Sequence, residues 1–228
     1  MIKFLAKGLI RDRSRSLFPL LTIIITVTLV IFGIGFMEGA MNNFLQSTAV
    51  ISSGHVKVVT KAYEKESSQL PNDLALFETN KIIQNLSDLY PNYFWTPRIT
   101  FGGLLDTPNE DGDTKEQGPV FGIGIDFHSK TSRQIEIWEL EKYLLHGNLP
   151  KNTNDALIST KLAKQLSVNV GSTVTLISTT MDNAFTTYNF EITGIFNLNK
   201  GQVDRQMMLV DISGPRHALG MEGAASEI

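Results

Sequence analysis

The sequence predicts an α+β protein, in which one amino-terminal transmembrane helix is followed by a mixed α/β extracytoplasmic domain with two subdomains. Three observations support this fold class. Residues 17–37 form an uncharged, apolar run of 21 residues. Basic residues precede this run. The chain after it alternates between helix-like and strand-like patterns, without an internal repeat or a low-complexity tract.

The run from Leu17 to Met37 is long enough to cross a bilayer. As an α-helix it would measure about 31 Å, which matches a hydrocarbon core about 30 Å thick. Pro19 should fall in the first turn, where its missing N–H breaks no helix hydrogen bond. A cleaved signal peptide is the alternative, but its apolar region is only about 7–15 residues long and precedes a small-residue cleavage site, which "FMEGAMNN" does not resemble. We therefore predict an uncleaved anchor.

Basic residues predict the direction of the span. Arg11, Arg13 and Arg15 lie directly before it. The next lysine after it is Lys57. Because positive charge stays on the cytoplasmic side, we assign the three arginines as topogenic residues and expect a cytoplasmic amino terminus. Two interpretations of the leader, residues 1–16, stay open: an amphipathic helix on the anionic inner leaflet, or a charged flank of the span.

Two glycines at the outer end of the span predict a helix-packing face. Gly35 and Gly39 form one G-x-x-x-G spacing, which lets a second helix approach closely. A single pair of this kind is common in membrane helices, so it predicts a contact face without identifying the partner.

The composition after the span limits the class of the outer domain. Residues 38–228 contain 15 basic and 22 acidic residues, so nucleic acid is not an expected partner. They are numerous enough to build a core of one domain or two small subdomains. The chain has no cysteine, which excludes disulfides and thiolate chemistry and is typical of a bacterial extracytoplasmic domain.

Periodicity and capping residues predict the elements of the first part of this domain. The expected helix at 73–90 has Asn72 as its N-cap, and Pro91 follows its end. In chain order we expect a strand at 54–61, a polar loop at 62–72, the helix at 73–90, strands at 93–105 and 118–126 around a hairpin-like acidic loop at 106–117, and a short helix at 138–150 that closes on Gly147.

The second part should be richer in strands. In chain order we expect a strand at 155–160, a capped helix at 161–166, and strands at 171–180, 186–198 and 205–212, joined by loops at 181–185 and 199–204. A subdomain boundary near Pro150 would separate this part from the preceding αβ part.

No motif of a catalytic site is present. The chain lacks H-E-x-x-H, G-x-S-x-G and a P-loop, so we predict no enzyme activity and no catalytic, cofactor-binding or metal residues. The loop at 106–117 resembles a calcium loop in composition, but it lacks the D-x-[DN]-x-[DN]-G spacing, and we expect it to be solvated. The side chains that give it this composition are Asp106, Asn109, Glu110, Asp111, Asp113 and Glu116.

The histidines also fail to form a recognisable site. His55, His128, His146 and His217 have no spacing typical of paired metal ligands. The stretch "DFHS", residues 126–129, brings together an acid, an imidazole and a hydroxyl. Neighbouring side chains of a strand point to opposite faces, so we do not expect these groups to form a proton relay.

The order of several segments nevertheless resembles a known family. After the basic leader and the span come "SSGHVKVV", "VFGIGID", "LLHGNLP", "DALISTKLAKQLSVNVGSTVTLIS" and "FEITGIFN". This arrangement resembles the amino-terminal half of ABC transporter permeases of the type that includes MacB, LolC, LolE and FtsX. The resemblance covers essentially the whole chain, and no single motif is diagnostic without this order.

The resemblance implies a four-helix permease protomer that dimerises, with a MacB-like periplasmic core domain between the first helix and the other three. It also implies a bacterial inner-membrane location and a separate cytoplasmic ATPase that binds ATP, so that this chain needs no cofactor. The second protomer, the lipid bilayer and a periplasmic adaptor or lipoprotein are the other implied partners. The periplasmic domain would act as a mechanical lever, in lipoprotein release or in efflux of drugs or peptides.

The chain departs from this pattern where it stops, after "GMEGAASEI". We expect the rest of the periplasmic domain and three further transmembrane helices to be missing, because the chain is either a fragment or a truncated gene product. An alternative function is a single-pass, anchored binding or sensor module for an extracytoplasmic ligand. An anchored hydrolase is a third possibility, for which the sequence offers no catalytic constellation.

Overall fold

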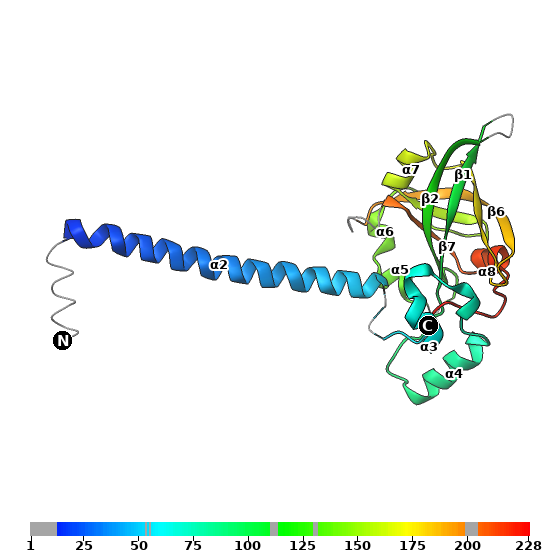
Figure 1. The fold of residues 1–228 in the computed structure, drawn as a ribbon, viewed down its shortest axis with the longest axis horizontal. Coiled ribbons are helices and arrows are strands. Elements are labelled where there is room, and N and C mark those ends of the chain that lie inside the picture. Colours follow the sequence, from blue (N-terminus) through cyan, green and yellow to red (C-terminus); the bar gives the residue numbers. More distant parts are fainter. Residues whose placement is uncertain (1–12, 53, 55, 110–113, 130–131, 199–204) are drawn as a thin grey trace. The chain divides into compact units, whose positions relative to one another are not determined.

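The computed structural model describes residues 13–52, 54, 56–109, 114–129, 132–198 and 205–228. Contacts divide the chain into two units, Met1–Ser52 and Ser53–Ile228. In Figure 1 the first unit contains the long helix α2, and the second contains the strands and the shorter helices.

The apolar run lies within one continuous helix, α2, which extends from Arg13 to Ser52. Its stretch Leu17–Met41 is long and apolar enough to cross a membrane, and the side chains of this stretch are exposed. The predicted amino-terminal apolar helix is therefore confirmed. The expected position of Pro19 is wrong, because the helix begins upstream of it and Pro19 lies inside the helix. Beyond Met41 the helix continues for about 16 Å at 1.5 Å per residue.

Two threonines place hydroxyl groups within the apolar stretch of α2. The Thr22 hydroxyl donates to the Phe18 carbonyl at 2.9 Å, and the Thr26 hydroxyl donates to the Thr22 carbonyl at 2.7 Å. Hydrogen-bonding groups in hydrocarbon must find partners inside the protein, so these bonds make both residues compatible with a membrane span.

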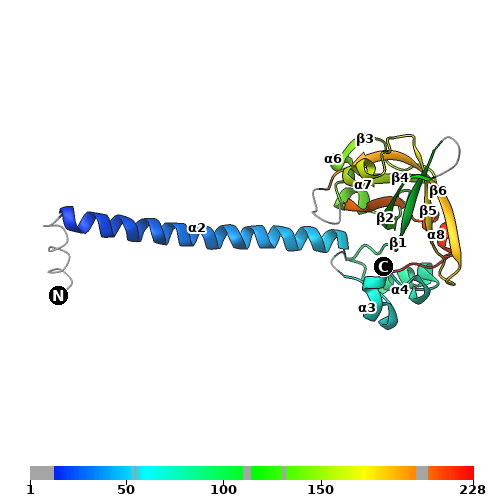
Figure 2. The same ribbon diagram turned by 45° about the horizontal axis from the view of Figure 1, so that its top comes forward.

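One sheet organises the second unit. Its strands are β1 Ile99–Pro108, β2 Thr114–Ile125, β3 Leu144–Gly147, β4 Asp155–Ser159, β5 Thr173–Thr179, β6 Phe185–Phe196 and β7 Met207–Asp211. Their order is β3-β6-β4-β7-β2-β1-β5, and β5 also pairs with β6. The first half of β6 pairs with β5 and its second half with β4, so six strands close into a barrel, with β3 added on β6. Figure 2 shows the sheet curving around its core.

Burial explains why the central strands have continuous apolar runs. Every residue of β4 and β7 is buried. β7 lies between β4, which is antiparallel to it, and β2, which is parallel to it. Helix α7 contacts β4, β2 and β6, and α8 contacts β7, β6, β2 and β1. Strands covered on both faces have no solvated face to fill with polar residues, so they do not alternate.

Short helices complete the second unit. They are α3 Lys61–Glu66, η1 Ser67–Gln69, η2 Asn72–Leu74, α4 Thr79–Leu89, α5 Gln134–Ile137, α6 Leu140–Tyr143, α7 Thr160–Gln165 and α8 Ser213–Leu219. Side-chain oxygens cap two of them: Thr60 accepts from the Tyr63 N–H at 3.0 Å, and Ser159 accepts from the Leu162 N–H at 3.2 Å. Such caps satisfy donors that the first helical turn leaves unpaired.

Several predicted elements are confirmed. β1 and β2 form the expected antiparallel hairpin around the acidic loop. β4 leads into the capped helix α7 as expected, and β5, β6 and β7 occupy the three predicted strand regions. The loop at 199–204 lies outside the described residues. These elements have strong local patterns, since their apolar periodicity and caps lie within one short segment.

Other predicted elements are wrong in extent or type. The polar stretch at 62–72 contains α3 and two 3₁₀ turns, because Thr60 caps a helix there. The helix expected at 73–90 begins only at Thr79. The region expected as one helix at 138–150 divides into α6 and strand β3, because residues from Leu144 onward pair with β6. The strand expected at 54–61 is absent from residues 56–60, which form a bend and an irregular segment.

The proposed division near Pro150 has no counterpart in the contacts. Strands from both sides of Pro150 form the same sheet, and β4 lies between β6 and β7 in the closed barrel. The second unit therefore begins at Ser53 and continues to Ile228. A boundary at residue 150 would cut through this shared strand pairing, so the sheet does not support a division at that position.

Candidate functional site

The segment that follows α2 meets the last residues of the chain. We call residues 54–60 the linking segment and residues 224–228 the return segment. The Val58 N–H donates to the Ile228 carbonyl at 2.8 Å, and the Ile228 N–H donates to the Val58 carbonyl at 3.1 Å. Figures 1 and 2 both place the carboxyl end beside α3, which follows the linking segment in the chain.

The return segment also pairs with two other parts of the domain. Ala225 and Leu76 exchange backbone hydrogen bonds at 3.0 and 2.8 Å. Glu227 and Arg98 exchange another pair at 3.2 and 2.8 Å. Between them, the Ser226 hydroxyl accepts from the Thr100 N–H at 3.1 Å. The return segment is thus a hydrogen-bonded hub that joins the linking segment, the residues before α4 and the start of β1.

A charged cluster is buried at this hub. We call Lys57, Arg98 and Glu227 the Glu227 cluster. The Glu227 carboxylate pairs with the Lys57 ammonium, and its other oxygen lies 3.8 Å from Nη1 of Arg98. The Glu227 side chain is only 4% exposed, whereas that of Lys57 is 31% exposed. Removing one member of a buried pair leaves an uncompensated charge, which typically costs about 3–5 kcal/mol.

Arg98 is held by its own neighbours. Its guanidinium lies 5.0 Å from the ring centroid of Trp138. The Gln134 amide oxygen, when it faces this guanidinium, accepts from Nε at 2.5 Å and from Nη2 at 3.2 Å. Burial lowers the pKa of Arg98, and the negative charge of Glu227 opposes this shift. Arginine still keeps its charge at neutral pH. The cluster therefore places the Glu227 side chain between a lysine and an arginine.

The acidic and hydroxyl groups near residues 126–129, whose adjacency in the sequence raises the possibility of a relay, make structural hydrogen bonds. The Asp126 carboxylate accepts from the N–H groups of His128 and Ser129 at 3.0 and 2.8 Å, which makes a local turn. Asp211 accepts from the Phe127 N–H at 3.2 Å and from the Ser213 hydroxyl. The described residues contain no group of three His, Cys, Asp or Glu side chains arranged to hold a metal.

The acidic loop is only partly described. Asp106 lies in β1 and Glu116 lies in β2, so these two carboxylates belong to the hairpin strands. Glu110, Asp111 and Asp113 lie outside the described residues.

The predicted topogenic and packing residues all lie on or before α2. Arg11 lies outside the described residues, and Arg13 and Arg15 lie at the start of the helix. Around Gly35 and Gly39, an added Cβ would meet no described atom within 4 Å. The roles of these five residues stay predictions.

The comparisons with known proteins concern α2 and most of the domain, up to the start of the return segment. The sequence profile of the MacB-like periplasmic core domain matches residues 16–224. The chain belongs to this family. The expected resemblance to permeases of the MacB type is thereby confirmed.

Two solved structures are similar to this chain. One is the extracellular domain of the noncanonic ABC-type transporter YknZ from Gram-positive bacteria, with 14% identity, a TM-score of 0.48, and coverage of 75% of this chain and 79% of that chain. The other is the periplasmic region of MacB from Actinobacillus actinomycetemcomitans, with 14% identity, a TM-score of 0.45, and coverage of 75% and 70%. No curated protein matches the sequence.

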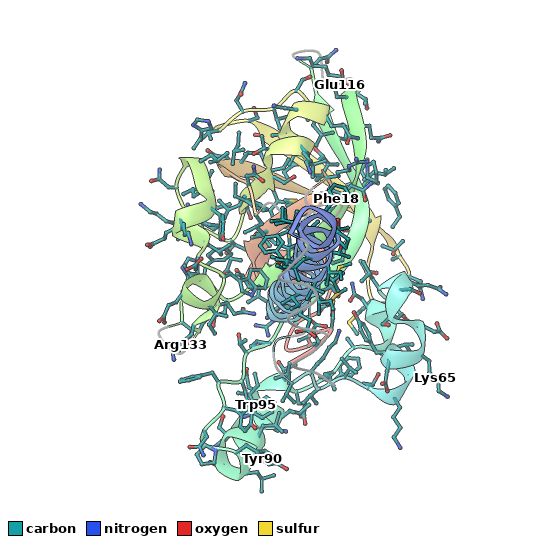
Figure 3. All side chains as sticks on the ribbon, turned by 90° about the vertical axis from the view of Figure 1, so that its left-hand side faces the viewer. Phe18, Lys65, Tyr90, Trp95, Glu116 and Arg133 are labelled. Carbon is teal, nitrogen blue, oxygen red and sulfur yellow. The ribbon has the colours of Figure 1, made fainter. Side chains whose placement is uncertain are left out.

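This MacB-like domain also exposes an aromatic surface. In the segment that follows α4 in the chain, the ring centroids of Tyr90, Tyr93 and Trp95 lie 5.8–6.3 Å apart. The side chains of Tyr90 and Tyr93 are about half exposed. The Arg133 guanidinium lies 4.9 Å from the ring centroid of Phe94. Figure 3 labels Tyr90, Trp95 and Arg133 in this part of the domain. Exposed apolar surfaces of this kind are typical of sites that contact other molecules.

Sequence reasoning did not find the Glu227 cluster in this MacB-like domain. Its three residues are far apart in the chain, and none belongs to a motif. One weak signal was present: Glu227 lies in a stretch of small and mostly apolar residues, "GAASEI". A charged residue in such a stretch suggests that its side chain is buried and paired. A partner for such a carboxylate can be identified only after the long-range pairing is known.

Proposed function

We propose that this chain is part of an ABC transporter permease that couples a separate cytoplasmic ATPase to work in the cell envelope. The family match over residues 16–224 carries the proposal, because it includes most of the apolar helix and nearly all of the domain. Two further features support it. The apolar stretch of α2 is long enough to cross a membrane, and the chain connects it directly to a domain that begins at Ser53.

In this proposal the partner ATPase binds ATP, and this chain contributes movement without a cofactor. A second permease protomer completes the membrane part. The amino terminus lies in the cytoplasm, and the domain lies outside the bacterial inner membrane. The cargo belongs to the envelope, as in lipoprotein release or efflux of drugs or peptides, and a periplasmic adaptor or a lipoprotein is the external partner.

The test is purification of the tagged permease from its native membrane in mild detergent, followed by ATP hydrolysis in lipid nanodiscs. We expect a P-loop ATPase to co-purify and hydrolyse ATP in a vanadate-sensitive manner. A control variant replaces α2 with an unrelated single span of the same length, and it should lose most of this activity. A protein that retains its fold but carries no ATPase, even after cross-linking in the membrane, would contradict the proposal.

The aromatic surface favours a second candidate function, an anchored binding or sensor module. Tyr90, Tyr93 and Phe94 offer exposed rings, which suit contacts with a ligand or protein. Under this alternative, Tyr93→Ala and Phe94→Ala would abolish ligand binding in a chain that never associates with an ATPase. Under the permease proposal, the ATPase remains bound in these variants.

The proposed orientation depends on the topogenic arginines. Replacing Arg11, Arg13 and Arg15 together by glutamate should weaken or invert insertion, because positive charge would no longer mark the cytoplasmic side. Protease accessibility of the domain in intact spheroplasts measures the result. The matched control changes the same amount of charge at Lys115, Lys151 and Lys164, which are exposed on the domain, and should leave the topology unchanged. Unchanged topology in the arginine variant would refute this assignment.

A further inference from the structure

The hub at the return segment joins parts of the chain that are distant in sequence. Val58 and Ile228 form one backbone pair, and Glu227 and Arg98 form another. Lys57 and Glu227 connect the same segments through their side chains. The linking segment follows α2 in the chain, so a pull on the carboxyl end of α2 would be transmitted to the domain through these residues.

We infer that the Glu227 cluster, with the Val58–Ile228 backbone pair, is the mechanical link that passes displacement of the linking segment to the return segment and to β1. This inference rests on the proposed function, in which the domain moves as a lever. Lys57 and Glu227 are then positioning residues, because they act by holding two segments together.

The geometry fits a link better than a general contribution to stability. Glu227 binds the linking segment through its carboxylate and binds Arg98 through both its backbone and its side chain. Arg98 is itself fixed against Trp138. Movement of Lys57 is therefore opposed by a continuous series of polar contacts. This series ends at Arg98, the residue immediately before β1.

A second aromatic contact strengthens the same connection. The Lys57 ammonium lies 5.9 Å from the ring centroid of Tyr63, which is buried in α3. The Tyr63 hydroxyl lies 2.8 Å from the Thr100 hydroxyl in β1. The linking segment is thus tied to β1 by two routes, one through Glu227 and Arg98 and one through Tyr63 and Thr100.

The other lysine and arginine ion pairs of the described residues are of a different kind. Lys81 pairs with Glu78, Arg133 with Glu136 and Lys142 with Glu139, each three residues apart and largely exposed. Pairs of this type contribute little to stability, because solvent screens them. The Glu227 cluster instead joins separate segments in a site from which water is largely excluded, so its loss should act at that junction.

The test is single-molecule pulling of the full chain in a lipid nanodisc. One DNA handle is attached at Ser52→Cys, which is chemically selective because the chain has no cysteine, and the other at a peptide tag after Ile228. In the parent protein the first event should be separation of the linking and return segments. Glu227→Gln should raise the rate of this event at zero force about 100-fold, as expected when a buried pair is broken.

Two control variants separate a link from general stability. Glu222→Gln removes an exposed carboxylate in the turn just before the return segment, and should leave the first event unchanged. Ile158→Ala weakens the buried core of β4 but not the junction, so it should lower the force of later events only. The inference is overturned if Glu227→Gln opens at the rate of Glu222→Gln, or if Ile158→Ala accelerates the first event as much as Glu227→Gln does.

A partner variant keeps the test decisive if Glu227→Gln does not fold. Lys57→Met removes the cation whose side chain is partly exposed, and tryptophan fluorescence checks that the domain is native. It should also accelerate the first event, whereas an unchanged rate overturns the inference. The pulling measurement needs no ATPase. A chain that binds no ATPase would therefore contradict the proposed function while leaving the mechanical result separately measurable.

Discussion

Gly122→Ala in β2 should lower the free energy of unfolding of the domain by about 3 kcal/mol, the upper part of the usual range for an overpacked core. Gly122 lies opposite Phe101 in the pairing of β2 with β1. A Cβ added at Gly122 would lie 2.0 Å from Cζ of Phe101. Phe101 is completely buried, so its ring has no free volume into which it can move.

Denaturant unfolding followed by tryptophan fluorescence measures this effect on the domain, because both tryptophans, Trp95 and Trp138, lie outside α2. Gly102→Ala is the matched control on the same hairpin. Its added Cβ would make an ordinary contact of 3.6 Å with Leu70, so we expect a change within about 0.5 kcal/mol.

A second substitution tests the physical cause of the loss. Combining Gly122→Ala with Phe101→Leu should recover part of the stability that Gly122→Ala removes, since the smaller side chain frees the space that the new methyl group needs. Equal losses in Gly122→Ala and Gly102→Ala, or no recovery in the double variant, would contradict the described packing of the hairpin.

The sequence predicted best those elements whose structure depends on residues that are close together in the chain. The apolar run of α2, the β1–β2 hairpin and the Ser159 cap of α7 each depend on residues within one short segment. Periodicity and capping chemistry operate at this range, so these elements could be predicted.

The barrel closure could not be predicted in this way. It requires β6 to pair with β5 in one half and β4 in the other, and nothing in the local pattern of residues 185–196 identifies two partners. The same reason explains the wrong helix at 138–150: Leu144 has a helix-compatible pattern, but pairing with β6 fixes it as a strand. Tertiary pairing overrides local preference in both cases.

The candidate site was missed for a related reason. Lys57, Arg98 and Glu227 are ordinary charged residues in the sequence, and none of them belongs to a recognisable motif. These three side chains come together only because the return segment pairs with a segment about 170 positions earlier, as the Val58–Ile228 bonds show. Motif searches identify chemistry that is close in sequence, whereas a junction between distant segments has no fixed spacing.

Gly147→Ala at the end of β3 should destabilise the domain by about 4 kcal/mol, because three costs combine. The φ of Gly147 is +84°, a conformation that costs a residue with a Cβ about 1–2 kcal/mol. The added Cβ would lie 2.1 Å from the Thr193 carbonyl oxygen and 2.8 Å from Cα of Gly194. Both atoms belong to the backbone of β6, so neither can rotate away, and the bond from the Asn148 N–H to the Thr193 carbonyl, 2.9 Å long, would be broken.

Gly171→Ala separates backbone strain from the steric clash. Gly171 has a φ of +90°, almost the same as Gly147, but a Cβ there would meet no described atom within 4 Å. Its alanine variant should therefore lose only about 1 kcal/mol, from strain alone. The difference between the two variants in denaturant unfolding measures how firmly β3 is held against β6. If both alanine variants unfold at the same denaturant concentration, β3 does not lie close enough to β6 to obstruct a methyl group, and the pairing that replaces the predicted helix at 138–150 is itself wrong.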